Sequence, residues 1–295
     1  MIKYYDRRSK SYEIEKVAGE NMLKWSYESP IGKGFLELLV KRKLFSKFYG
    51  HYCDTKLSSK KIKSFVKGFN MNMDEYEKSI DEYTSFNDFF YRKLKPTARE
   101  INKDKNIFIS PSDSRLLSID NIDENHSFKV KGFDYSLKEI LGSKELADKY
   151  KGGICLIFRL CPTDYHRFHF IDNGTCSSTT KIKGNYYSVS PIALEKVSKV
   201  FTSNKREYSI LHSENFGDLL YLEVGATCVG GIIQTYKENS KVYKGDEKGF
   251  FKFGGSTVII LVEKDKLKLD EDIIYHSKKD IEVIVKMGEK IGVRI

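Results

Sequence analysis

The sequence has little proline and cysteine and no long apolar run. Only five prolines and 21 glycines occur in 295 residues, which excludes collagen-like and proline-rich low-complexity architectures. The five cysteines form no C-x-x-C pair, so they suggest neither a disulfide framework nor a zinc site and indicate a reduced, intracellular protein. The longest clean apolar run, residues 258–262, is far shorter than the about 20 residues that cross a bilayer. The polar first ten residues lack the apolar segment of a signal peptide, so any membrane contact is expected to be peripheral.

The chain is rich in apolar residues and carries an excess of positive charge. With 40% hydrophobic and 13% aromatic residues it can bury a sizeable core, as one large domain or two modest ones. The formal net charge is +10, and it is concentrated between residues 31 and 70, where ten lysines and arginines face only two acidic residues. Ser29 and Pro30 suit an N-cap and a first-turn proline, and apolar residues then recur at near-helical spacing until Gly50 offers a stop.

This basic, amphipathic stretch has three interpretations. It could lie flat on an anionic lipid surface, it could pack on its own domain with a solvated lysine face, or it could bind the phosphates of a nucleic acid. No helix-turn-helix, zinc-finger or aromatic RNA-binding signature accompanies the charge. The pattern alone leaves the choice open.

The predicted secondary structure changes from helix to strand along the chain. Residues 1–95 are predicted to be mostly helical, with an acidic helix at 74–83 and a capping box at Ser85 and Asp88 opening a helix over 86–94. Short β-type runs follow, and strands are expected at residues 107–109, 116–119, 154–160, 219–224, 229–234, 250–253, 257–262 and 281–285. Helices should interrupt them at 137–150 and 191–200. The expected fold is α+β, with a helical, basic N-terminal region (1–95) docked on a β-rich catalytic body of mostly antiparallel sheet (96–295).

Three islands carry residues suited to chemistry. Asp113 lies in SPSDS (110–114), His166 and His169 lie in DYHRFH (164–169), and Ser256 lies in GGST (254–257) between two β-type runs. An Asp, a His and a Ser can form a catalytic triad in any chain order, with the serine as nucleophile, the histidine as base and the aspartate orienting the histidine. A metal site at the histidine pair is disfavoured, because no further ligands accompany the two histidines. Each island also has a plain structural interpretation: a turn aspartate, a loop-positioning histidine, or a glycine bulge.

Together these islands resemble the signature set of the phosphatidylserine decarboxylases, pyruvoyl-dependent proenzymes, and in particular their bacterial type II-like members. Further matching segments are FNDFFYRKL (86–94), GNYYSV (184–189), VGATCVG (224–230) and KGDEKG (244–249). The similarity covers roughly residues 85–295.

The resemblance implies that the chain cuts itself between Gly255 and Ser256. Asp113 would hold His169, His169 would deprotonate Ser256, and Ser256 would become a pyruvoyl group that forms a Schiff base with the substrate amine. His166 would return a proton after decarboxylation or position the loop. The covalent pyruvoyl group would be the cofactor, with no metal and no pyridoxal phosphate. Phosphatidylserine would become phosphatidylethanolamine and carbon dioxide.

The same resemblance makes membrane docking the preferred interpretation of the basic region, through Phe35, Lys41, Arg42, Lys43 and Lys47. We therefore expect a peripheral protein on the cytoplasmic side of the cell membrane, with no nucleic acid partner. The cleaved chains (1–255 and 256–295) should stay associated, and the oligomeric state stays open, with a homodimer as one option. Two alternatives are a non-catalytic module that binds anionic lipid and a serine hydrolase with a free Ser256 hydroxyl.

Overall fold

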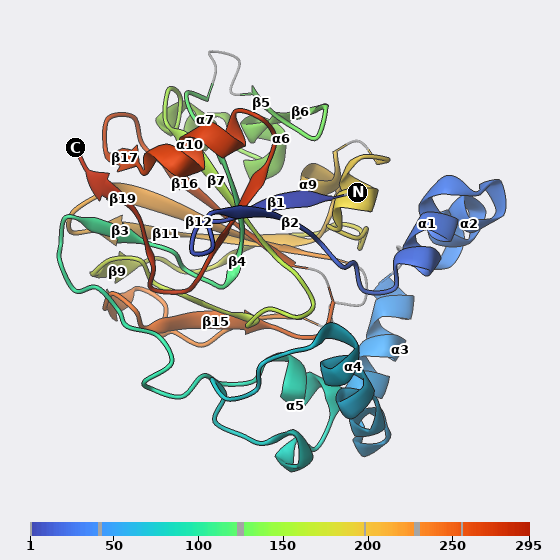
Figure 1. Cartoon of the computed structure of the whole chain (residues 1–295). Coiled ribbons are helices and arrows are strands. Elements are labelled where there is room, and N and C mark those ends of the chain that lie inside the picture. Colours follow the sequence, from blue (N-terminus) through green and yellow to red (C-terminus); the bar gives the residue numbers. More distant parts are fainter. Residues whose placement is uncertain (1, 41–42, 123–126, 198, 227–230, 255) are drawn as a thin grey trace.

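A large twisted sheet forms the centre of the molecule (Figure 1). The computed structural model describes residues 2–40, 43–122, 127–197, 199–226, 231–254 and 256–295. In order across the sheet, the strands are β14 (Ser240–Val242), β9 (Gly174–Cys176), β11 (Arg206–Ser213), β12 (Gly217–Gly225), β16 (Ser256–Val262), β7 (Ile154–Leu160), β4 (Ser114–Ile119), β18 (Glu282–Val285), β1 (Lys3–Asp6) and β2 (Ser11–Ile14), and β10 (Thr180–Ile182) pairs with β11. Among the described strands only the β1–β18 pair is parallel, so the expected α+β fold with mostly antiparallel sheet is confirmed.

Three small sheets complete the β structure. They are β13 (Ile232–Gln234) with β15 (Glu247–Phe251) and β8 (Arg167–His169), β17 (Leu267–Leu269) with β19 (Lys290–Arg294) and β3 (Ile107–Ile109), and β5 (Ser127–Val130) with β6 (Phe133–Ser136). The large sheet buries both of its faces. Along β16, Val258 and Ile260 pack into one apolar cluster and Ile259 and Leu261 into the other, because successive side chains of a strand point to opposite faces.

Helices gather at the N-terminal end and around the sheet. They are α1 (Glu20–Glu28), α2 (Pro30–Phe35), the π-helical η1 (Leu36–Val40), α3 (Lys43–Asp54), the 3₁₀ turn η2 (Lys56–Lys61), α4 (Ile62–Phe69), the 3₁₀ turn η3 (Ile80–Glu82), α5 (Phe86–Phe90), α6 (Leu137–Leu141), α7 (Lys144–Lys149), α8 (Pro191–Leu194), α9 (Val200–Ser203) and α10 (Glu271–Ser277). The first helices lie along one side of the sheet in Figure 1. No helix in the described part of the chain is long and apolar enough to cross a bilayer.

Several boundaries differ from the sequence prediction. Residues 3–14, expected in the helical region, form two strands of the large sheet, and the helix expected to stop at Gly50 continues to Asp54. The acidic helix expected at 74–83 is wrong, since only the short turn η3 forms there. The Ser29 cap and Pro30 start are confirmed: Ser29 Oγ accepts a hydrogen bond from the Gly32 N–H at 2.9 Å.

Helices α4 and α5 make a small aromatic core that reaches the functional region. Phe86, Phe89 and Phe90 are buried there, and Phe253 packs against them. The rings of Phe90 and Phe253 have centroids 5.0 Å apart in an edge-to-face arrangement. The N-terminal helical region therefore fixes the segment that leads to Ser256.

Candidate active site

Ser256 is the first residue of β16, and its hydroxyl is buried without a hydrogen-bond partner among the described residues. Its backbone lies between Gly225 of β12 and Leu160 of β7. The next hydroxyl, Thr257 Oγ1, is equally buried and unpartnered. A buried polar group without a partner costs about 1–3 kcal/mol, so such atoms in a native fold call for a reason.

The segment before Ser256 is held in a defined turn. Gly254 has a φ of 144°, in the region that side-chain-bearing residues rarely adopt. The Phe253 N–H donates a 2.7 Å hydrogen bond to Asn87 Oδ1 of α5. Gly255, the other residue of the expected cleavage peptide, lies outside the described residues. The chain thus approaches the site through Phe253, which is anchored on α5, and through a glycine whose conformation other residues rarely adopt.

His166 is a buried, neutral imidazole with one free nitrogen. Its Nδ1 lies 3.0 Å from the Asp164 carbonyl, and its ring centroid lies 3.8 Å from that of Phe90. Burial lowers the pKa of His166 to about 3, since the Asp164 hydrogen bond only partly offsets the loss of hydration. With the Nδ1 proton assigned to the Asp164 hydrogen bond, Nε2 carries a lone pair that contacts no described partner.

His169, by contrast, uses both ring nitrogens. Nδ1 lies 3.0 Å from the Gly245 carbonyl and Nε2 lies 3.0 Å from Tyr165 Oη. Burial lowers the pKa of His169, so it is also neutral at pH 7. Strand β8 pairs His169 with Glu247, and the Phe251 N–H donates to the His166 carbonyl at 2.9 Å. Of the two histidines, His166 therefore lies nearer to the turn that precedes Ser256.

Asp113 is a fully buried carboxylate surrounded by cations. It accepts hydrogen bonds from Arg99 Nη2 at 2.7 Å, Lys286 Nζ at 2.9 Å and the Met287 N–H at 2.9 Å. Burial alone would raise the pKa of Asp113, but Lys286 and Arg99 outweigh it and lower the pKa to about 2. The carboxylate is therefore ionised at neutral pH.

The expected hydrogen bond between Asp113 and His169 is not formed among the residues that the structure describes, because both groups are saturated by other partners. Their motifs are still adjacent, since the His169 N–H donates to the Pro111 carbonyl at 2.9 Å. Ser256 Oγ likewise has no histidine partner in the described chain. The structure thus collects the three islands in one region without assembling a triad, and the roles of these residues stay predictions.

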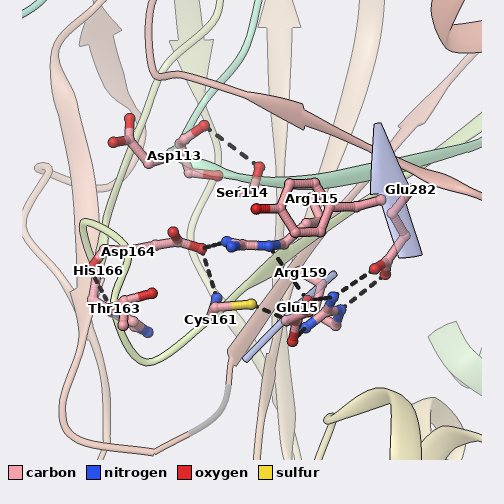
Figure 2. Close-up of polar contacts among 12 residues, drawn as sticks. Glu15, Asp113, Ser114, Arg115, Arg159, Cys161, Thr163, Asp164, His166 and Glu282 are labelled. Atoms are coloured by element: carbon pink, nitrogen blue, oxygen red, sulfur yellow. Dashed lines mark hydrogen bonds and ion pairs between the residues drawn. The ribbon is translucent and has the colours of Figure 1, made fainter. Parts of the chain in front are cut away.

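A buried charge network that the motif search missed lies beside the histidine loop (Figure 2). Asp164 accepts hydrogen bonds from Arg115 Nη1 and from the Cys161 N–H, the latter at 2.7 Å. Arg159 donates to Glu282 at 2.5 and 2.9 Å and to Glu15 at 2.6 and 3.0 Å. An arginine inside an otherwise apolar strand, as Arg159 is in β7, was the available sequence signal, because a buried cation must be paired.

A cavity of about 650 Å³ opens between the N-terminal helices and this end of the sheet. The helical region contributes apolar side chains to it, namely Met22, Leu23, Leu36, Phe45, Phe65 and Phe69. The sheet body contributes Arg115, Arg159 and Lys286, together with Phe253 and Gly254 next to the expected cleavage peptide. The acidic Glu15, Glu75 and Asp164 also line it, so the cavity suits an amphiphile with its apolar part against the helices and its polar headgroup among these charged residues.

Of the residues expected to dock on a membrane, Phe35 is 36% exposed and Lys47 is exposed. Lys41, Arg42 and the Lys43 side chain lie outside the described part of the chain. The same segment exposes further apolar side chains, among them Leu38 at 71% and Phe48 at 70%.

Known proteins resemble this chain over most or all of its length. The family model described as phosphatidylserine decarboxylase matches residues 86–293. Curated relatives named phosphatidylserine decarboxylase proenzyme include proteins of Clostridium novyi (59% identical over 295 residues, all of both chains) and Clostridium tetani (59% over 292 residues, 99% of this chain and 98% of the relative). That of Clostridium perfringens is 56% identical over 292 residues, 99% of each chain. The chain belongs to the phosphatidylserine decarboxylase family.

Proposed function

We propose that this protein decarboxylates phosphatidylserine to phosphatidylethanolamine and carbon dioxide, after cutting itself between Gly255 and Ser256. The observation that carries the proposal is the buried hydroxyl of Ser256, which has no hydrogen-bond partner among the described residues and lies two positions after a glycine that lines the cavity. The relatives' name, a proenzyme that acts on this lipid, supports the same conclusion.

Self-cleavage uses only groups of this chain and water. Ser256 Oγ attacks the Gly255 carbonyl carbon, the peptide C–N bond breaks, and an ester forms in its place. Removal of the Ser256 α-proton then expels the Gly255 carboxylate and leaves a dehydroalanine. Water converts this residue to a pyruvoyl group and ammonia. The Ser256 oxygen fits this role, since no hydrogen bond to a described residue has to break before it attacks.

The pyruvoyl group supplies a conjugated carbonyl that can accept the electron pair released as carbon dioxide leaves. His166 is the nearer histidine for the returning proton. Its low pKa means that it holds no extra proton in the free protein, while an anionic substrate beside Nε2 would raise that pKa. His166 would therefore gain its proton when substrate binds and release it to the substrate carbon.

His169 is our candidate base for self-cleavage, as the family resemblance implies. Its neutral imidazole can accept the Ser256 proton only after Nε2 leaves the Tyr165 hydroxyl. Asp113 would act at a distance, by keeping Arg99 and Lys286 in place beside the loop.

The cleaved chains should remain one folded unit. The small chain (256–295) would contain β16, which is hydrogen-bonded along its length to β12 and β7 of the large chain (1–255). It would also contain β18, which pairs with β4 and β1. Separating the chains would break the centre of the large sheet.

Access to a lipid substrate requires contact with a membrane. The exposed apolar side chains of α1 to α3 and cations such as Lys47 suit a peripheral site on the cytoplasmic face of the cell membrane. The apolar wall of the cavity comes in part from α1 and α3, so a lipid could pass from the membrane to the cavity along these helices.

Intact-mass analysis of the purified protein tests the function. The wild type should give two chains, and the small one should be lighter than a chain beginning with serine by the mass of one ammonia. Ser256→Ala should give one full-length chain. Thr257→Val is the matched control, because it removes the neighbouring hydroxyl, equally buried and unpartnered, and should leave cleavage intact.

Formation of carbon dioxide from phosphatidylserine by the two-chain protein completes the test. A folded wild type that stays in one piece would contradict the proposal. Capture of Ser256 in such an uncut protein by a fluorophosphonate would indicate a serine hydrolase instead.

A further inference from the structure

We propose that Arg115 and Arg159 form the receptor for the phosphodiester of the substrate, and that Glu15 occupies this receptor until the substrate displaces it. The proposal rests on the function proposed above and adds the residues that hold the headgroup. It starts from the buried network of Figure 2.

The two arginines are neighbours beside the cleavage site. In the large sheet, Arg159 of β7 lies opposite Thr257 of β16 on one side and opposite Arg115 of β4 on the other. Both side chains are more than nine-tenths buried, and both line the cavity that also contains Gly254. Two cations therefore lie on the face of the sheet to which Thr257 points, in the cavity that Gly254 also lines.

Arg115 retains an unused donor. Its Nη1 binds Asp164, while its buried Nε has no hydrogen-bond partner among the described residues and lies 3.4 Å from Glu15 Oε2, within ion-pair distance only. A buried guanidinium with a free N–H group at a cavity is a site for an oxyanion, since arginine presents several donors in a fixed plane.

Glu15 holds the position that such an anion would take. Its carboxylate binds Arg159 at 2.6 and 3.0 Å and lies within ion-pair distance of Arg115. Burial would raise the pKa of Glu15, but Arg159 and Arg115 outweigh it and lower the pKa to about 2. Glu15 therefore stays ionised at neutral pH, and its two oxygens bind Arg159 as two oxygens of a phosphate would.

Glu282 provides the contrast. It also pairs with Arg159, at 2.5 and 2.9 Å, and it is as buried as Glu15. It belongs to β18 inside the sheet, is not among the residues lining the cavity and makes no described contact with Arg115. Glu15 instead follows the edge strand β2, which pairs only with β1 in the described sheet, so it can withdraw at low cost.

The phosphodiester fits this receptor better than the substrate's carboxylate does. The carboxylate is lost as neutral carbon dioxide, so ion pairs with it would stabilise the substrate more than the transition state and slow the reaction. The phosphodiester keeps its charge throughout. Two guanidinium groups beside three carboxylates have no net attraction for a further anion, so the phosphodiester must replace Glu15.

Calorimetric titration of the uncut Ser256→Ala protein with dihexanoyl phosphatidylethanolamine, which has the phosphodiester and no carboxylate, tests the proposal. Adding Glu15→Gln should tighten binding about tenfold, because the competing charge is gone while an amide remains to hydrogen-bond. Adding Glu282→Gln should change binding by less than about twofold. Dihexanoylglycerol and free serine should bind all three proteins alike. Equal effects of the two substitutions, or no effect of Glu15→Gln, would overturn the proposal.

Arg115→Lys in the active protein gives a second measurement. Lysine keeps a cation beside Asp164 but removes the unpartnered Nε–H, so KM for a short-chain phosphatidylserine should rise about tenfold while kcat changes little. A fall in kcat at constant KM would contradict a binding role. The wild-type mass and decarboxylation measurements decide the function separately, whatever these variants do.

Discussion

The hydroxyl of Tyr165 lies 3.0 Å from Nε2 of His169, and Nδ1 of the same ring lies 3.0 Å from the Gly245 carbonyl. The carbonyl can only accept, so the proton resides on Nδ1 and the tyrosine donates to Nε2. The nitrogen that would act as a base is therefore covered in the uncut chain.

Tyr165→Phe should uncover that nitrogen. We expect self-cleavage at least as fast as in the wild type, because the base no longer has to break a hydrogen bond before it accepts the Ser256 proton. His169→Ala should block cleavage. Time-resolved intact-mass analysis after synthesis in a cell-free system measures both. Slower cleavage in Tyr165→Phe would mean that the tyrosine takes part in the proton transfer.

His166→Ala separates the two histidines. It should cleave normally and release little carbon dioxide, since rate losses of about 10²–10⁴ are usual when a general acid is removed. Cleavage is followed by mass, and carbon dioxide from carboxyl-labelled phosphatidylserine. An uncut His166→Ala protein would instead assign the self-cleavage base to the histidine nearer the turn.

Acid should destabilise the protein through His166. Its folded pKa of about 3 lies below the ordinary value of 6.5, so between these limits the unfolded chain binds more protons than the folded one. The free energy of unfolding should therefore fall as pH drops below 6.5, by up to about 1.4 kcal/mol per pH unit from this group. Urea titrations at several pH values, in the uncut Ser256→Ala background, should show a shallower decline for His166→Gln. Parallel declines would contradict the assignment.

Asp113→Asn should destabilise the fold as well as stop cleavage. It would leave the buried Arg99 and the partly buried Lys286 without their shared anion, a change that typically costs about 3–5 kcal/mol. Urea unfolding of Ser256→Ala with and without Asp113→Asn measures the cost. An unchanged midpoint would show that the carboxylate serves the chemistry alone.

Membrane binding should depend on the exposed side chains of α3. Leu44→Ser combined with Phe48→Ser removes apolar groups that are 64% and 70% exposed, and should reduce sedimentation with phosphatidylserine vesicles several-fold. Tyr275→Ser, at a site on α10 that is 55% exposed, is the control. Equal binding of both variants would exclude α3 as the docking surface.

Strands that are marked by a local apolar run could be predicted from the sequence. Strands that depend on a pairing partner far away in the chain could not. Strand β7 was predicted with its observed bounds, because a short apolar run buried on both faces has few other structures available. Strand β1 was missed, since its residues are mostly polar or partly exposed and its partner β18 lies at the other end of the chain.

The candidate site follows the same rule. Asp113, His166, His169 and Ser256 were found because each lies in a short motif. Glu15 was not found, because its partner Arg159 is 144 positions away and a single carboxylate in a polar segment carries no local signal. Tyr165 lay inside a motif, but only the folded arrangement reveals which histidine it covers.

The buried position of Ser256 also limits the chemical nature of the new N-terminus that cleavage before this residue can leave. New chain ends ordinarily appear at surfaces, where a charged amine is hydrated, yet this one would arise on a fully buried residue beside the central strands. An ammonium group enclosed there would carry a heavy electrostatic penalty, whereas a keto end is uncharged. The fold therefore disfavours simple hydrolysis of this bond, which would leave the buried ammonium group, relative to the route that leaves the uncharged keto group.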